Sequence, residues 1–330
     1  MRAVRLHAVG GPEVLELEER PRPEPGPGQV RVRAMAIGVG RPDALIRTGR
    51  YKWMPPLPAI PGNEMAGVVD AVGPGVLDLQ AGQPVLLSSR ELPERGGCYA
   101  EYACAPAAAL YPLPESIAFD DAVSLPNFQL AHALLFHCGG ANAARSVLLT
   151  GAAGGVASAL TQLASALGLQ VIGSARADAK RSFALANGAH LALDSAAPDL
   201  AQQVLRATNG RGVDLAIDPI GGELFVKCVE SLAPLGTAIS YNVLAGPPSR
   251  DVFATLREHL GKSLAVRVFS MHTFDQDVPL RRRLMVDSIE AMAAHRVRAP
   301  AATVLALADA RRAHQLLDAP ETIGKLILHP

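Results

Sequence analysis

A run of small residues between two apolar segments is the first feature whose residue types and spacing indicate a chemical role. Residues 146–176, SVLLTGAAGGVASALTQLASALGLQVIGSAR, predict a strand, a tight turn, a long helix and a second strand. Small side chains let such a turn approach a pyrophosphate, which the free amides at the helix start attract. The residues expected to bind a dinucleotide are Gly151, Ala153, Gly154, Gly155 and Val156. A tight turn without any ligand is the alternative.

The glycine fingerprint itself is imperfect, and its context strengthens the prediction. The three positions are Ala152, Gly154 and Ala157, where the usual pattern has glycine at the first and second. A strand before the turn, a helix after it and further strand-helix units downstream favour dinucleotide binding over an empty turn.

The end of the second strand indicates which dinucleotide is bound. That strand ends at Arg176 without an acidic residue, and Lys180 follows closely. An acid there would bond the ribose hydroxyls of NAD and repel a 2′-phosphate, whereas serine, arginine and lysine can bind one. We therefore expect NADPH rather than NADH, with Ser174, Arg176 and Lys180 at the phosphate. The alternative is that the basic residues only solvate a helix start.

Composition excludes several function classes. The chain has 330 residues, with Lys plus Arg and Asp plus Glu equal at 31 each, so no net field attracts nucleic acid or anionic lipid. Its four cysteines form no CxxC pair, which favours a reducing compartment. We find no signal peptide and no uncharged apolar run long enough for a membrane span, and we expect a cytoplasmic protein.

The pattern along the chain predicts a β-rich part followed by an α/β part. Short β-like runs separated by Gly and Pro fill the first 120 residues. From Ser146 apolar strands alternate with helices, including a helix expected over 223–236, which indicates a doubly wound parallel sheet of the Rossmann type. After Val266 the alternation becomes less regular, and this last part could complete the first β-rich domain.

The whole chain resembles the medium-chain dehydrogenase/reductase superfamily, in its zinc-free, zeta-crystallin-like quinone oxidoreductase branch. The matching stretches, in the family's order, are MRAVRLHAVGGPEVLELEE, RPDALIRTGRY, PGNEMAGVVDAVGPGV, GCYAEYACAP, LTGAAGGVASALTQLASALG and GKLILHP. The resemblance implies a Rossmann domain at 120–265 inserted into a GroES-like catalytic domain at 1–119 and 266–330. Cofactor and substrate would meet in a cleft between them. It also implies a homodimer or homotetramer assembled through the nucleotide domain.

Zinc is not expected in this chain. Relatives that use zinc place a cysteine and a histidine where this sequence has Gly40 and Asn63, and neither can replace a thiolate or imidazole ligand. The lobe that binds a structural zinc in those relatives needs four closely spaced cysteines, and only Cys98 and Cys104 lie in that region.

The resemblance also places candidate site residues. Tyr51 could donate a hydrogen bond to a substrate carbonyl or only wall the pocket, and Asn63 should face the reacting centre or only tie down its loop. Asn242 ends a strand at the edge where ligands bind in open α/β sheets. Phe269 matches the segment that meets the carboxamide in relatives, and a buried core aromatic is the alternative.

These features together predict a zinc-independent, NADPH-dependent reductase of quinones or α,β-unsaturated carbonyl compounds. One alternative is an enoyl-thioester reductase, for which Arg47, Arg50 and Lys52 could form a basic entrance. A second is a non-catalytic NADPH-binding sensor, because Gly40 and Ala131 stand where many relatives have asparagine and threonine.

Overall fold

The fold is given by a computed structural model, in which residues 1–319 and 322–330 are described. The chain divides into two compact units, called unit 1 (Met1–Pro126 and Ile289–Pro330) and unit 2 (Asn127–Ser288). The expected domain boundaries near 120 and 265 therefore differ from those of the structure. Residues 266–268 belong to unit 2 because they lie in a strand that pairs with its parallel sheet.

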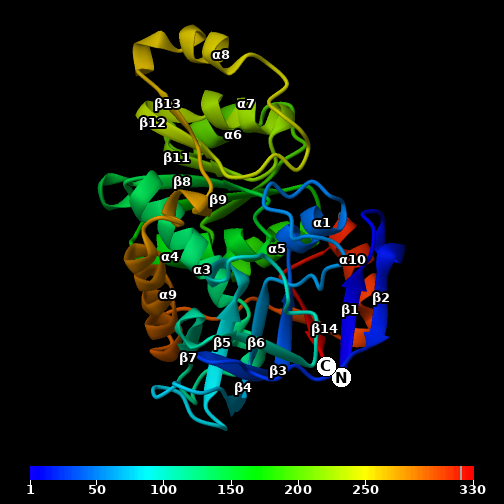
Figure 1. The fold of residues 1–330 in the computed structure, drawn as a ribbon. Coiled ribbons are helices and arrows are strands. Elements are labelled where there is room, and N and C mark those ends of the chain that lie inside the picture. The colour runs from blue at the N-terminus through cyan, green and yellow to red at the C-terminus, as the bar shows by residue number, and fades with distance from the viewer. Residues whose placement is uncertain (320–321) are drawn as a thin grey trace. The chain divides into compact units, whose positions relative to one another are not determined.

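Unit 1 is built on a mostly antiparallel sheet (Figure 1). Its strands are β1 (Arg2–Leu6), β2 (Leu15–Glu19), β3 (Gln29–Val39), β4 (Glu64–Val72), β5 (Pro84–Ser88), β6 (Tyr102–Pro106), β7 (Leu110–Pro112), β14 (Ala302–Ala306) and β15 (Lys325–His329). Its helices are α1 (Arg41–Arg47), α2 (Phe119–Ala122) and α10 (Ala310–Asp318), with short helical turns η1 (Pro12–Val14), η2 (Ser89–Glu91), η3 (Ala107–Ala109) and η8 (Leu307–Asp309). The large sheet has the order β14-β15-β3-β4-β5-β7, and β6 also pairs with β3.

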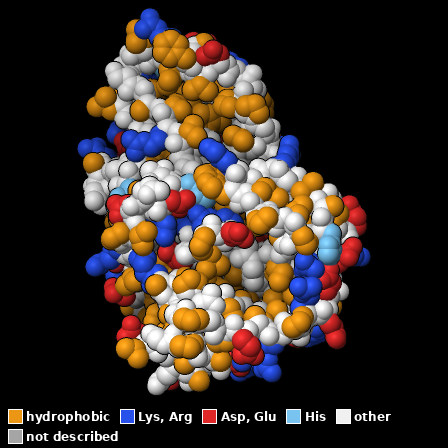
Figure 2. Space-filling view, in the orientation of Figure 1, with side chains coloured by type: hydrophobic (Ala, Val, Ile, Leu, Met, Phe, Trp, Pro, Cys, Tyr) orange, Lys and Arg blue, Asp and Glu red, His pale blue; other side chains and the backbone are white. Residues whose placement is uncertain are grey.

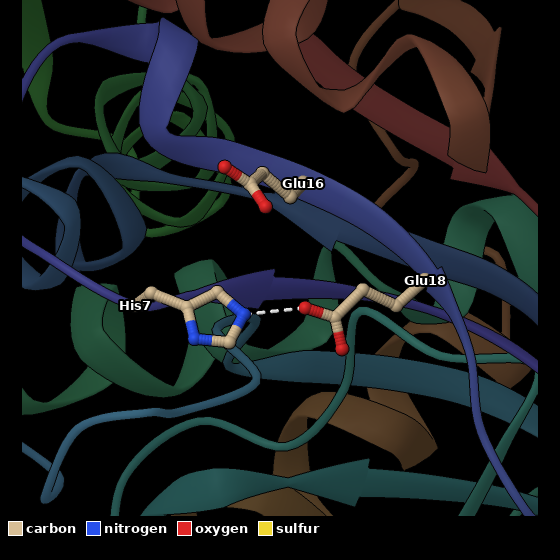
Figure 3. A group of neighbouring side chains, drawn as sticks. All are labelled: His7, Glu16 and Glu18. Carbon is tan, nitrogen blue, oxygen red and sulfur yellow. Dashed lines mark hydrogen bonds and ion pairs between the residues drawn. The ribbon is translucent and has the colours of Figure 1, made fainter.

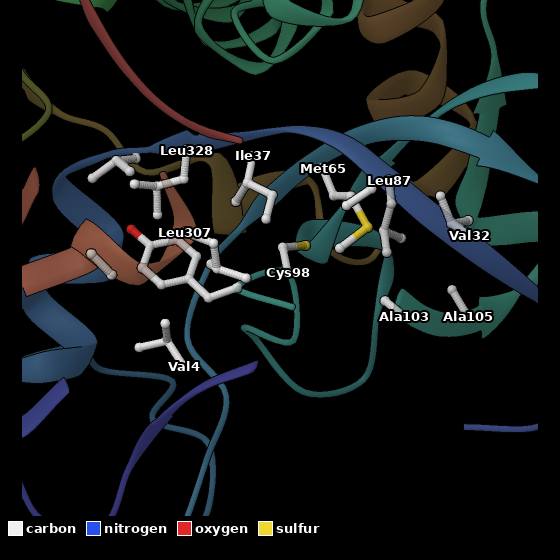
Figure 4. Close-up of a cluster of buried hydrophobic side chains, with 14 of the residues drawn as sticks. Val4, Val32, Ile37, Met65, Leu87, Cys98, Ala103, Ala105, Leu307 and Leu328 are labelled. Atoms are coloured by element: carbon white, nitrogen blue, oxygen red, sulfur yellow. The ribbon is translucent and has the colours of Figure 1, made fainter. Parts of the chain in front are cut away.

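The two ends of the chain share the core of unit 1. β15 pairs antiparallel with β3, which places Leu326 opposite Val39. Buried side chains from both ends, such as Val4 and Leu328, lie in one hydrophobic cluster (Figure 4). Each fully buried aliphatic side chain of this kind contributes about 2 kcal/mol, so the C-terminal segment is an integral part of the unit.

Unit 2 contains a six-stranded, wholly parallel sheet. Its strands are β8 (Ser146–Thr150), β9 (Gln170–Ala175), β10 (Leu191–Asp194), β11 (Val213–Asp218), β12 (Leu232–Ser240) and β13 (Ala265–Val268). Its helices are α4 (Gly155–Ala166), α5 (Asp178–Ala186), α6 (Leu200–Ala207), α7 (Gly222–Glu230) and α8 (Val252–Glu258), with shorter helical turns η4 (Ala133–Cys138), η5 (Ala141–Ala143), η6 (Leu260–Lys262) and η7 (Met271–Phe274). Helices α3 (Leu125–His132) and α9 (Val278–Ala293) cross the unit boundaries.

The strand order confirms the Rossmann prediction. The sheet runs β10-β9-β8-β11-β12-β13, which is the doubly wound order 3-2-1-4-5-6. The helix expected over 223–236 was wrong in its second half, because α7 ends at Glu230 and β12 begins at Leu232. Leu235 has a φ of 63°, and this local irregularity lies beside a register shift between β11 and β12. Among the described residues, no helix is long and apolar enough to cross a membrane.

Candidate active site

The glycine turn joins β8 to α4 in unit 2. Gly151 has a φ of 60°, which an L side chain rarely adopts, and the Gly154 amide donates to its carbonyl oxygen at 2.9 Å. A Cβ at Gly154 would meet nothing nearer than the Gly151 oxygen, 3.4 Å away, so the turn leaves space above it. The first amides of the 12-residue α4 have no partner within the helix and carry its positive end. This arrangement fits the pyrophosphate of a dinucleotide.

The start of α4 needs glycine for another reason. A Cβ at Gly155 would lie 2.5 Å from Nδ2 of Asn127, so this side chain reaches the first turn of the helix. The Val156 side chain is half-buried beside it. Ala153, like Ala152, is buried, so the small residues of the turn serve packing as well as approach to a ligand.

A buried acid that the sequence prediction missed fixes this edge of the sheet. Asp218, at the end of β11, is fully buried and accepts a hydrogen bond from the Thr150 hydroxyl at the end of β8. It also accepts from the amides of Ile220 at 3.1 Å and Gly221 at 2.6 Å. Burial raises the pKa of Asp218, while these donors lower it. The sequence signal for Asp218 was an acid at the end of the apolar strand VDLAID. Its partner Thr150 could not be read from the sequence.

The residues expected at the 2′-phosphate differ in exposure. Arg176 is exposed directly after β9, and Lys180 is half-buried in the first turn of α5. Ser174 lies in β9, and its buried hydroxyl has no hydrogen-bond partner among the described residues. The neighbouring Arg181 donates hydrogen bonds to the carbonyl oxygens of Ala175 and Arg176. No acid closes β9 itself, and two basic side chains follow it. Asp178 and Asp194 lie close by, and each forms an ion pair with Arg181.

Asn242 and Phe269 lie at the same edge of the sheet. Asn242 follows β12, and its Oδ1 accepts from the Val243 amide at 2.8 Å. Phe269 follows β13, and its amide donates to the Ser240 carbonyl at 2.8 Å. The Phe269 ring is buried against Phe274, with ring centroids 5.9 Å apart. The structure therefore brings both residues to the carboxyl ends of adjacent strands, where a nicotinamide would be held.

The candidate catalytic asparagine belongs to a buried polar group in unit 1. The Asn63 amide nitrogen donates to Asp43, and its oxygen accepts from the Ser89 hydroxyl. Asp43 is 2% exposed and also accepts from the Gly40 amide at 2.8 Å. Burial raises the pKa of Asp43 to about 7, and the nearby Glu64 carboxylate acts in the same direction. One amide hydrogen of Asn63 remains after these contacts.

Two further side chains complete this polar group. Lys325 is buried and forms an ion pair with Glu64, so it is not a solvated residue at the end of a strand. Tyr51 is half-buried, exchanges a hydrogen bond with Arg95, and lies near enough to Asp43 to feel its charge. Desolvation is the main cause that raises the pKa of Tyr51. Asn63 and Tyr51 thus lie in the same unit. Both interact with Asp43: Asn63 through a hydrogen bond, and Tyr51 through the Asp43 charge.

The basic entrance expected for an enoyl-thioester substrate is not formed as expected. Arg47 is 3% exposed and donates to Asp318 at 2.7 Å, so its guanidinium is not available to a solvent phosphate. Arg50 and Lys52 are exposed, and the Lys52 ammonium lies 5.4 Å from the centre of the Trp53 ring.

A metal-ligating set is present at another place in unit 1. Within residues 1–319 and 322–330, the one group of three or more potential ligands is His7, Glu16 and Glu18, whose ligand atoms lie within 4.8 Å of one another. Figure 3 shows the His7 ring turned toward Glu18, with Glu16 on the same strand as Glu18. Glu18 already pairs with His7 and with Arg5. Glu18 therefore already has the Arg5 guanidinium as its cation.

Comparison with known proteins gives a consistent relationship over the full chain. Residues 26–115 match the alcohol dehydrogenase GroES-like domain, and residues 155–285 match the family model described as zinc-binding dehydrogenase. The quinone oxidoreductase of Mus musculus is 36% identical over 273 residues, which cover 80% of this chain and 81% of the relative. The synaptic vesicle membrane protein VAT-1 homolog of Rattus norvegicus is 32% identical over 348 residues, covering 100% of this chain and 84% of the relative.

Solved structures agree with these relatives. A quinone oxidoreductase of Pseudomonas syringae matches with a TM-score of 0.89 and 31% identity, covering 100% of this chain and 99% of that one. The Escherichia coli quinone oxidoreductase complexed with NADPH matches with a TM-score of 0.86 and 26% identity over 100% of both chains. The chain therefore belongs to the medium-chain dehydrogenase/reductase superfamily, as an oxidoreductase of its quinone oxidoreductase branch.

Proposed function

We propose that this protein is a zinc-independent, NADPH-dependent reductase of quinones or α,β-unsaturated carbonyl compounds. The observation that carries the proposal is the edge of the unit 2 sheet. There the open glycine turn and the first amides of α4 lie beside a second strand, β9, which ends at Ala175 and is followed by Arg176 rather than by an acid. The relatives named quinone oxidoreductase support the same reaction class.

In this proposal, different residues of unit 2 bind the different parts of NADPH. The turn Gly151–Gly155 and the first amides of α4 would hold the pyrophosphate. Arg176 and Lys180 would hold the 2′-phosphate, because each adds a positive charge where an acid would repel it. Asn242 and Phe269 would hold the nicotinamide end.

On the substrate side, a conjugated carbonyl explains how the reaction proceeds without a metal. NADPH supplies the hydride when it is bound. Addition to the carbon remote from the carbonyl moves negative charge onto the oxygen, where a hydrogen-bond donor can stabilise it. The remaining amide hydrogen of Asn63 is our proposed donor, held by Asp43 and Ser89. Tyr51 is the second proposed donor at this oxygen.

Zinc independence rests on the chemistry of the donor set. Gly40 has no side chain, and both amide atoms of Asn63 are engaged by Asp43 and Ser89. Neither position can supply the thiolate or imidazole ligand that a catalytic zinc requires.

The cofactor assignment can be tested by binding. We expect the purified protein to bind NADPH at least about tenfold more tightly than NADH, the value of one charge-assisted contact. Replacing Lys180 and Arg176 together by alanine should weaken NADPH binding and leave NADH binding unchanged, as measured by titration calorimetry. The exposed Arg206 in α6, changed to alanine, is the matched control for loss of surface charge. Equal loss for both nucleotides would contradict the assignment.

The substrate assignment can be tested by turnover. Metal-stripped protein should consume NADPH anaerobically with a quinone or an enone, and the Asn63→Ala variant should lower kcat/KM without changing the Kd for NADPH. Tight NADPH binding with no consumption of either acceptor would contradict the reductase and leave a nucleotide-binding sensor.

We also propose that the protein is a homodimer or a dimer of dimers, joined through β13. This strand is at the edge of the parallel sheet, so no further strand among the described residues pairs with its outer backbone groups. Val268 is 83% exposed, and Phe253 and Leu260 nearby are 72% and 60% exposed. Figure 2 shows hydrophobic side chains gathered over the region of α8 and β13. A second copy would cover this surface by pairing strand to strand.

A reducing, cytoplasmic location fits the cysteines. All four are free in the structure, and Cys98 and Cys228 are buried. We propose this location on the basis of their reduced state.

A further inference from the structure

A series of hydrogen bonds crosses the interior of unit 1 from Asp318 to Tyr99, whose hydroxyl interacts with Asp43 beside the candidate catalytic asparagine. It begins at Asp318, which accepts from Arg47 at 2.7 Å. Arg47 also contacts Nδ1 of His314 at 3.1 Å, and Nε2 of His314 contacts the Tyr99 hydroxyl at 3.0 Å. Tyr99 in turn exchanges a side-chain hydrogen bond with Asp43, the carboxylate that holds Asn63.

The direction of every bond in this series is fixed by Arg47. A guanidinium can only donate, so Nδ1 of His314 must accept and the ring must carry its hydrogen on Nε2. That hydrogen is donated to the Tyr99 oxygen, which leaves the phenolic hydrogen for Asp43. Burial and the adjacent Arg47 lower the pKa of His314 to about 4, so the imidazole is neutral at physiological pH. A neutral ring with this tautomer satisfies both of its contacts.

The loop that carries Asn63 is built against Tyr99. The Tyr99 amide donates to the Pro61 carbonyl at 2.9 Å. Gly62 has a φ of 94°, and a Cβ there would lie 2.2 Å from the Tyr99 ring, so only glycine allows this packing. The Ser89 amide donates to the Asn63 carbonyl at 2.9 Å. The backbone of Asn63 is thereby fixed, and its side-chain orientation depends on Asp43 and Ser89.

We propose that Tyr99 and His314 are positioning residues for the reaction, because they hold Asp43 as the acceptor that orients the Asn63 amide toward a substrate carbonyl oxygen. The inference rests on the proposed role of Asn63 as a hydrogen-bond donor. Neither Tyr99 nor His314 touches the substrate. Both are fully buried, which is a costly position for two polar side chains that serve packing alone.

The charge state of Asp43 controls how well this arrangement works. A protonated Asp43 is a poorer acceptor for the Asn63 amide, so we expect kcat/KM to fall as the pH drops through the pKa of Asp43. The titratable groups that face Asp43 come from several elements: Glu64 of β4, Lys325 of β15, Cys98 and Tyr99 before β6, and Tyr51 after α1. Of these, Tyr99 presents a neutral hydroxyl to Asp43, so we expect its removal to raise the pKa of Asp43.

The test is the Tyr99→Phe variant, which keeps the ring against Gly62 and removes only the hydroxyl. We expect kcat/KM at neutral pH to fall about tenfold, the loss of one hydrogen bond to a charged group. The acidic limb of the pH profile should move upward by about one unit. Tyr111→Phe is the matched control, because it removes another buried hydroxyl, one that donates to Glu91 at 2.7 Å. Its acidic limb should stay in place.

His314→Gln tests the direction of the series. A glutamine can accept from Arg47 with its oxygen and donate to Tyr99 with its nitrogen, so its acidic limb should match that of the parent protein. A shift as large as that of Tyr99→Phe would contradict the fixed neutral tautomer. Unchanged activity and an unchanged acidic limb in Tyr99→Phe would overturn the whole proposal.

A readout without catalysis separates this proposal from the proposed function. In protein labelled with ¹⁵N-asparagine, the Asn63 side-chain signal is identified by its loss in Asn63→Ala. Its chemical shift should titrate with Asp43, and the midpoint should rise in Tyr99→Phe but not in Tyr111→Phe. If these midpoints behave as expected while no quinone or enone is reduced, the positioning series stands and the proposed substrate fails. If the midpoints are identical in all variants, the series is refuted whether or not the enzyme turns over.

Discussion

The buried His314 makes the stability of unit 1 depend on pH in a way that can be calculated. Burial and the adjacent Arg47 lower its pKa in the folded protein to about 4, from an ordinary value of 6.5. Between pH 4 and pH 6.5, His314 is therefore protonated in the unfolded chain and neutral in the folded chain. The stability contributed by the neutral imidazole is fully present above pH 6.5 and is lost as the pH falls toward 4. Linkage gives a cost of about 2 kcal/mol at pH 5 and almost none at pH 7.5.

The His314→Gln variant isolates this effect, because glutamine can keep both contacts and does not titrate. We expect the two proteins to have similar free energies of unfolding at pH 7.5, and the variant to be more stable by about 2 kcal/mol at pH 5. The titration of Asp43 is common to both proteins and cancels in the difference.

Trp53, the single tryptophan, reports on unit 1 in urea unfolding followed by fluorescence. The comparison needs only the difference between the two proteins at each pH, with the urea dependence fitted for each. An equal loss of stability in both proteins between pH 7.5 and pH 5 would refute the reasoning, since it would mean that His314 is not held neutral by its surroundings.

Three further predictions follow from other contacts. Lys325→Met should lower the free energy of unfolding by about 3 kcal/mol, because it leaves the half-buried Glu64 without its cation. Adding Glu64→Gln should recover part of this loss in urea unfolding. Thr150→Val removes a hydrogen-bond donor to the buried Asp218, so it should lower the free energy of unfolding of unit 2 by about 1–3 kcal/mol. It should also weaken NADPH binding. An unchanged Kd for NADPH and an unchanged melting temperature would contradict the role given to this bond. Val268→Lys should give a monomer in light scattering with little loss of stability, whereas an unchanged oligomer would exclude β13 as the interface.

The nucleotide-binding fold could be predicted because its signals are local. The apolar strand, the small-residue turn and the following helix are contiguous, and the structure shows them as β8, Gly151–Gly155 and α4. The error over 223–236 is also local in origin. The apolar pattern ESLAPLG continues the helix in sequence, but the chain turns into β12 after Glu230 because pairing with β11 decides the conformation there.

The polar interior of unit 1 could not be predicted because its contacts are distant in sequence. Tyr99 and His314 are 215 residues apart, and Lys325 and Glu64 are 261 apart. The sequence marked Asn63 as a candidate, yet it gave no means to see that Asp43 holds its amide. It also placed Arg47 at a basic entrance, whereas the guanidinium is buried against His314 and Asp318.

The type of a basic residue is therefore a weaker signal than its place in the folded unit. Arg176 and Arg47 look alike in the sequence, but Arg176 is exposed at the end of a strand and Arg47 is buried in a helix. The difference arises from the C-terminal segment, which returns to unit 1 and brings α10 into contact with α1. Only the assembled unit decides which charge meets a ligand.

The most direct test of the central claim follows the hydride itself. Metal-stripped protein is incubated anaerobically with an enone and NADPH that carries deuterium at C4 of the nicotinamide, separately on each face, and the product is examined by mass spectrometry and NMR. The proposed function predicts that one of the two labelled cofactors places a single deuterium on the carbon remote from the carbonyl, with no dependence on added zinc. Deuterium at the carbonyl carbon, or transfer that requires zinc, would contradict it.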